Sequence, residues 1–154
     1  MSEEPSEAAE AVRELLARVV GALGLAASVE VTDDGEICTG TVHGDDLGLF
    51  IGRHGQTIDA VQHLAQRAAG ARAGEGPRIV IDAEGYRERR AVMLQRHADQ
   101  AAEDALRYGR PVALDAMTAS ERRLVHEYLR DHGGVQTYSE GDEPDRRLVV
   151  APLP

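Results

Sequence analysis

The stretch Ile51-Gly52-Arg53-His54-Gly55-Gln56-Thr57-Ile58-Asp59-Ala60-Val61-Gln62 carries the strongest fold signal in the chain. Two glycines bracket an arginine and a histidine, and glycine permits a tight turn and close approach of another backbone. The loop leads into the N-terminus of an expected helix, where free amides and the helix dipole favour an anion. Arg53 adds a planar cation that matches phosphate, and His54 adds an imidazole hydrogen-bond donor. The stretch therefore predicts a phosphate-contacting turn, with an ordinary helix–helix turn as the alternative.

The sequence around this loop predicts a regular order of elements. Apolar residues at helical spacing indicate a helix over residues 8–23, and alternating residues over 28–31 and 36–43 indicate a hairpin. A short helix at 47–51 precedes the loop, a helix over 56–70 follows it, and a buried strand at 78–82 comes next. The expected order is thus α-β-β-α-α-β.

The second half of the chain predicts a separate small α/β unit. A long helix over 86–108 is followed by a short strand at 112–114, and Thr118-Ala119-Ser120-Glu121 forms a capping box that opens a helix to about residue 132. A hairpin over 135–139 and 147–150 completes the order α-β-α-β-β. We expect an α+β protein with a disordered acidic N-terminus over 1–6, one domain over 7–85 and a second over 86–151.

The first motif and its surroundings resemble the type II KH domain. In that family the Gly-x-x-Gly loop clamps the backbone of about four single-stranded nucleotides, and bases lie in an adjacent apolar groove. The resemblance implies an RNA-binding loop made of Gly52, Arg53, His54, Gly55, Gln56 and Thr57.

A second motif places Arg122 and His126 four residues apart, hence on one face of a helix. Both lie at the border of the apolar face, where we expect their polar ends to face outward; a solvated face with an Arg123–Glu127 ion pair is the alternative. The run from Ser120 to His126 resembles the R-3-H domain, which binds single-stranded nucleic acid. The resemblance implies a nucleic-acid-binding set of Arg122, Arg123, His126 and Arg130, with Arg87 and Arg90 as further phosphate contacts.

Three further runs join these motifs: Tyr86-Arg87-Glu88-Arg89-Arg90, Gly109-Arg110-Pro111-Val112 and Thr137-Tyr138-Ser139-Glu140-Gly141. Together they resemble the Jag family of bacterial proteins (SpoIIIJ-associated or KhpB-type) over about residues 8–151. Many members carry a further N-terminal domain and a charged linker, which we expect this chain to lack.

That resemblance implies a cytoplasmic protein that binds single-stranded RNA and regulates transcripts affecting cell division or the envelope. It implies a small single-KH protein as heterodimer partner, or self-association, and a peripheral link to a membrane insertase. A protein-interaction adaptor, with RNA binding secondary, is the alternative.

Composition excludes several chemistries. All 17 basic residues are arginine, which removes the lysine of P-loop enzymes and protein kinases. The lone Cys38 cannot supply a multi-cysteine zinc site, and His126-Glu127-Tyr128-Leu129-Arg130 lacks the second histidine of a zinc peptidase. No apolar run approaches the roughly 20 residues of a membrane span. We expect no catalysis, cofactor, metal or small-molecule substrate.

The formal net charge of −10 opposes nucleic-acid binding at first sight, yet it is unevenly distributed. Residues 1–85 hold 6 arginines and 15 acidic residues, a net of −9, whereas residues 86–154 hold 11 and 12, a net of −1. Acidic groups on remote faces are screened beyond a Debye length of about 8 Å. The charge therefore predicts weak non-specific binding that depends on local contacts.

Overall fold

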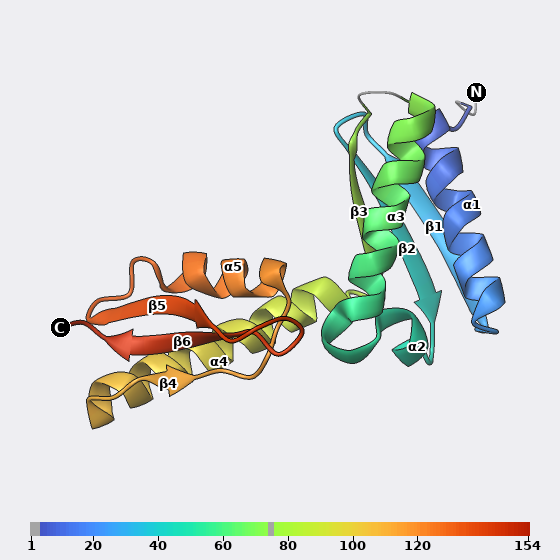
Figure 1. The fold of residues 1–154 in the computed structure, drawn as a ribbon. Coiled ribbons are helices and arrows are strands. Elements are labelled where there is room, and N and C mark those ends of the chain that lie inside the picture. Colours follow the sequence, from blue (N-terminus) through green and yellow to red (C-terminus); the bar gives the residue numbers. More distant parts are fainter. Residues whose placement is uncertain (1–3, 74–75) are drawn as a thin grey trace. The chain divides into compact units, whose positions relative to one another are not determined.

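The computed structural model describes residues 4–73 and 76–154, and the chain divides into two compact units, Met1–Tyr86 and Arg87–Pro154 (Figure 1). The sequence places the domain boundary near Gly85. The sequence predicts a disordered N-terminal segment over residues 1–6. Residues 1–3 of that segment lie outside the described residues. Ser6, by contrast, caps the first helix, because its Oγ accepts a hydrogen bond from the Ala9 amide at 3.0 Å.

The first unit contains the predicted order of elements. They are α1 (Glu7–Ala22), β1 (Ala27–Asp33), β2 (Ile37–Gly44), α2 (Gly48–Ile51), the 3-10 turn η1 (Arg53–Gly55), α3 (Gln56–Ala73) and β3 (Arg78–Ala83). The sheet has the order β1-β2-β3, with β1 antiparallel and β3 parallel to β2. The helix expected to end at Gly70 continues to Ala73.

Helices α1 and α3 lie side by side on one face of this sheet (Figure 1). Alternate residues of β2 and β3 are buried against them, as the period of two along a strand requires. Gly40 of β2 allows α1 to approach closely: a Cβ there would lie 2.6 Å from Leu16 Cδ1 and 2.7 Å from Val12 Cγ1. The missing side chain at Gly40 therefore allows α1 to pack closely on the sheet.

The second unit confirms the predicted order α-β-α-β-β and, with the first, the α+β class. Its elements are α4 (Tyr86–Tyr108), β4 (Val112–Ala113), α5 (Ala119–Leu129), β5 (Val135–Glu140) and β6 (Arg147–Pro152). The sheet has the order β4-β6-β5 and is antiparallel throughout. Buried small residues of α4 share its core with Val125, Leu129 and Val150. Helix α5 ends at Leu129, before the expected end near residue 132.

Within residues 4–73 and 76–154, no helix has the length and apolarity that crossing a membrane requires.

Candidate nucleic-acid interface

The turn between α2 and α3 requires glycine at its first position. Gly52 has φ 75° and ψ 175°, a region that is essentially restricted to glycine. A Cβ there would lie 2.3 Å from Thr57 Oγ1 and 2.9 Å from the Thr57 amide nitrogen. His54 and Gly55 both have positive φ, at 55° and 77°, so the chain reverses within two residues. The sequence therefore encodes this turn locally, through backbone conformations that favour glycine.

Tyr86 supports the turn. A Cβ on Gly55 would lie 2.7 Å from the Tyr86 hydroxyl oxygen, and the Tyr86 ring packs against the core of the first unit. Gly55 is buried, while Arg53 and Gln56 are exposed and His54 and Thr57 are half-buried. The six predicted loop residues thus lie together on a supported turn. Sequence reasoning missed the role of Tyr86, which lies 31 positions from Gly55 and follows no local periodicity.

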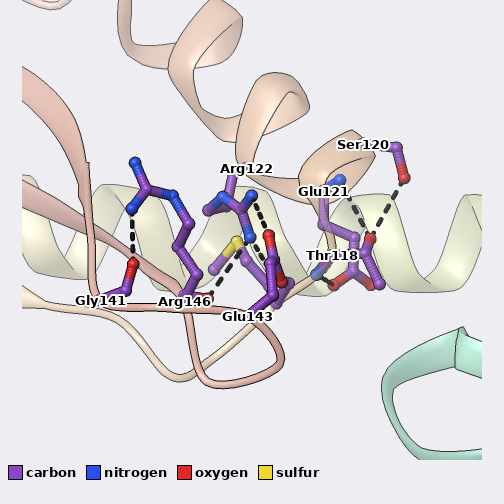
Figure 2. Close-up of polar contacts among 8 residues, drawn as sticks. Thr118, Ser120, Glu121, Arg122, Gly141, Glu143 and Arg146 are labelled. Carbon is purple, nitrogen blue, oxygen red and sulfur yellow. Dashed lines mark hydrogen bonds and ion pairs between the residues drawn. The ribbon is translucent and has the colours of Figure 1, made fainter.

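Arg122 occupies a different environment from the one expected, as Figure 2 shows. Its side chain is 9% exposed and points from α5 into the loop between β5 and β6. Nη1 donates to the Met117 carbonyl at 2.6 Å, and Nη2 donates to Glu143 Oε1 at 2.7 Å. The expectation that its polar end faces outward is wrong, because the long side chain reaches internal acceptors that replace water around the buried charge.

His126 and Arg123 remain exposed on α5. The His126 Nδ1 is hydrogen-bonded to Thr137 Oγ1 of β5, and Arg123 Nε lies 3.2 Å from Glu127 Oε1, the ion pair considered as an alternative. An open groove of about 460 Å³ runs beside them. Its lining combines three arginines and other polar side chains with apolar surface: Ala119, Arg122, Arg123, His126, Thr137, Tyr138, Ser139, Arg146 and Leu148.

Three of the four residues that the second motif predicted line this groove. The fourth, Arg130, is exposed just after α5 and does not line it. It also includes Arg146, whose Nη1 donates to the Gly141 carbonyl at 2.5 Å. Sequence reasoning gave Arg146 no role in the site, because only the folded hairpin carries it to α5.

Arg90 is not available as the phosphate contact that the sequence predicted. Its Nε donates to Glu121 Oε1 at 2.7 Å and its Nη2 to Oε2 at 3.4 Å, and the two side chains are 18% and 12% exposed. Glu121 also completes the Thr118 capping box, accepting from the Thr118 amide at 3.2 Å. The Glu121 carboxylate therefore links α4 to α5, and its ion pair uses the hydrogen-bond donors of the Arg90 guanidinium. Arg87 is half-buried in the first turn of α4.

Two family models match the chain: the KH domain of KhpA/KhpB over residues 9–81 and the R-3-H domain over residues 92–152. The RNA-binding protein KhpB of Lactiplantibacillus plantarum is 38% identical over 144 residues, which make up 94% of this chain and 45% of that protein. KhpB of Clostridium symbiosum is 34% identical over 140 residues, covering 90% and 63%. KhpB of Bacillus subtilis is 32% identical over 112 residues, covering 71% and 54%. The chain thus spans about half the length of these curated relatives.

Proposed function

Because the chain belongs to the KhpB-type family, with a KhpA/KhpB KH domain followed by an R-3-H domain, we propose that it binds single-stranded RNA. The turn at residues 52–55 is the primary contact, and the groove beside α5 is the second. The observation that carries the proposal is the turn's backbone, in which two positive-φ glycines flank an exposed arginine at the start of α3.

The turn suits a phosphate backbone for physical reasons. Gly52 and Gly55 let the chain reverse sharply, which leaves Arg53 exposed on the turn for a nucleotide backbone to approach. The first amides of α3 and the dipole of that 18-residue helix favour the phosphate charge. Arg53 makes no ion pair with any carboxylate of the described residues, so its guanidinium keeps its donors for a ligand. Thr57 and Tyr86 pack close to Gly52 and Gly55, which supports the turn before RNA binds.

In the second unit, different residues have different roles. Arg123, His126 and Arg146 line the groove and contact RNA in this proposal. Arg122 instead positions the loop that carries Glu143 and Arg146, because its donors are used internally. It is thus a positioning residue rather than a primary ligand contact.

Binding of labelled single-stranded RNA to the Arg53→Asp/His54→Asp variant tests the proposal. We expect affinity to fall at least about tenfold, because two phosphate-directed groups become repulsive. Arg13→Asp/Ala17→Asp is the matched control, since both positions are exposed on α1 and the formal charge changes equally. Wild-type affinity in the loop variant, with the control also unchanged, would show that the turn is not the clamp.

A salt titration tests the number of contacts. Contacts to about four phosphates predict a log–log slope near −3 for single strands. A flat response would indicate that the protein acts as an adaptor and not through its nucleic-acid contacts.

The proposal extends to cellular role. We place the protein in the cytoplasm as a post-transcriptional regulator affecting cell division or the envelope, without catalytic activity of its own. Support comes from the curated relatives, which are named RNA-binding proteins. The KH model that the chain matches is shared by KhpA and KhpB, which supports a small single-KH protein, or a second copy, as partner. Sequencing of crosslinked transcripts, and sedimentation with and without a KhpA-type protein, test these two points.

A further inference from the structure

Tyr108, the last residue of α4, exposes an aromatic ring that the two sites above do not use. The residue is 59% exposed, although the chain has only five aromatic residues with which to build its cores. Two guanidinium groups lie against this ring: Arg107 Cζ is 5.8 Å and Arg110 Cζ is 5.6 Å from the ring centroid. These distances are within the range of cation–π attraction.

The local backbone fixes this arrangement. Gly109 ends α4 with φ 64°, and its amide donates to the Ala105 carbonyl at 2.9 Å. Pro111 follows with a restricted φ and leads into β4, at the α4–β4 corner in Figure 1. Arg107 and Arg110 therefore lie on the two sides of the C-terminal end of α4, where the backbone conformation is fixed.

The two cations are not neutralised within the protein. Among the described residues, neither Arg107 nor Arg110 forms an ion pair with a carboxylate, in contrast to Arg90 and Arg122. A cation near a helix C-terminus is favoured by the helix dipole. That effect accounts for the arginines, but it gives no reason to leave the tyrosine ring in water.

We propose that Arg107, Tyr108 and Arg110 form a further contact site for single-stranded RNA on the second unit. A base takes the place of a guanidinium group on the Tyr108 ring, and the two guanidinium groups contact the flanking phosphates. Proteins that bind single strands combine aromatic stacking with adjacent cations in this way. The inference rests on the proposed function, because it assigns a further site for the same ligand.

Fluorescence anisotropy with a labelled single-stranded RNA of mixed sequence, on the full chain, tests the site. Tyr108→Leu should weaken binding about fivefold or more, since it removes the stacking face, while Tyr108→Phe should bind like the wild type. Arg107→Gln/Arg110→Gln should make the log–log salt slope shallower by about 1.4, or 0.7 for each lost phosphate contact. Arg13→Gln/Arg18→Gln removes two exposed arginines from α1 and should change neither quantity.

The outcomes separate this inference from the proposed function. If the wild type binds RNA and the Tyr108→Leu and double-arginine variants match its affinity and salt slope, the site is overturned while the loop proposal stands. If the wild type binds no RNA at all, the proposed function fails, and this inference fails with it. Thermal melts of each variant exclude loss of binding through unfolding, and the double-arginine variant tests the site even if Tyr108→Leu does not fold.

Discussion

Replacing Arg122 with alanine should destabilise the second unit, contrary to the view of this residue as an outward-facing ligand. The Nη1 bond to the Met117 carbonyl is short, at 2.6 Å, and Met117 is 5% exposed. A hydrogen bond from a charged donor contributes about 1.5–3 kcal/mol. The Glu143 partner is 60% exposed, so its ion pair adds only about 0–1 kcal/mol. We expect a total loss of about 1.5–4 kcal/mol.

A urea titration followed through amide resonances of α5 and β5 measures this loss. Local probes are needed because a chain with two units need not unfold in one transition. Arg122→Lys should recover little of the stability, since one ammonium group cannot reproduce the planar fork that joins two acceptors.

Arg123→Ala is the matched control on the same helix. Its side chain is 81% exposed and, among the described residues, pairs with Glu127 four residues on, so the change should cost less than about 0.5 kcal/mol. If Arg122→Ala lowers the free energy of unfolding no more than this control does, the positioning role is refuted. Arg122 would then be assigned as a direct ligand contact. RNA binding by Arg122→Ala should be compared with that of His126→Ala only at urea concentrations where both are folded.

Three further outcomes follow from the first unit. Gly52→Ala should lower RNA affinity and cost about 1–3 kcal/mol, because its φ of 75° is strained for alanine and its Cβ would meet Thr57; unchanged melting and affinity would contradict this. The hydrogen bond to Glu30 raises the pKa of His43, so its stabilisation is complete below about pH 6.5 and is lost as the pH rises through the raised pKa. The stability gap between wild type and His43→Gln should therefore be larger at about pH 6 than at about pH 9, and equal gaps in urea titrations would refute the linkage. Burial, and secondarily the charge of Asp33, raises the pKa of the Cys38 thiol, so iodoacetamide should label it only as the first unit opens; rapid labelling of the native protein would count against this packing.

The features that the sequence predicted are those encoded over a few neighbouring residues. Strand alternation and helical spacing placed the elements, and the glycines at 52 and 55 marked the turn because only local backbone geometry is involved. The capping box opened by Thr118 is confirmed for the same reason, since its partner lies three residues away. Element ends were less exact: α3 extends three residues beyond Gly70, where no strong stop signal interrupts it.

The features that sequence reasoning missed depend on residues far apart in the chain. Arg90 reaches Glu121 across 31 positions, and Arg122 reaches Glu143 across 21. Helical spacing shows which face an arginine occupies, but not whether a loop from elsewhere folds over it. Burial of Arg122 is therefore a tertiary property, and a motif defined by its spacing to His126 carries no information about it.

This internal pairing changes what the charge distribution means for RNA binding. By composition the second unit is nearly neutral, at −1, and its arginines suggest a broad basic surface. In the structure, however, Arg90, Arg122, Arg123 and Arg147 each face a carboxylate. Those guanidinium groups contribute little net positive potential where a phosphate would bind. The charge of each is cancelled by its carboxylate partner, which lies well within a Debye length of about 8 Å.

In the proposed mode of binding, RNA contacts therefore rest on a few cations without a carboxylate partner, on stacking and on backbone amides. Arg53 is one such cation in the first unit, and Arg107, Arg110 and Arg146 are such cations in the second. Each set alone is small, so either unit should bind a single strand weakly. A strand held by both units gains from effective concentration, since the second contact becomes intramolecular. Removing either set should therefore lose much of this gain in affinity.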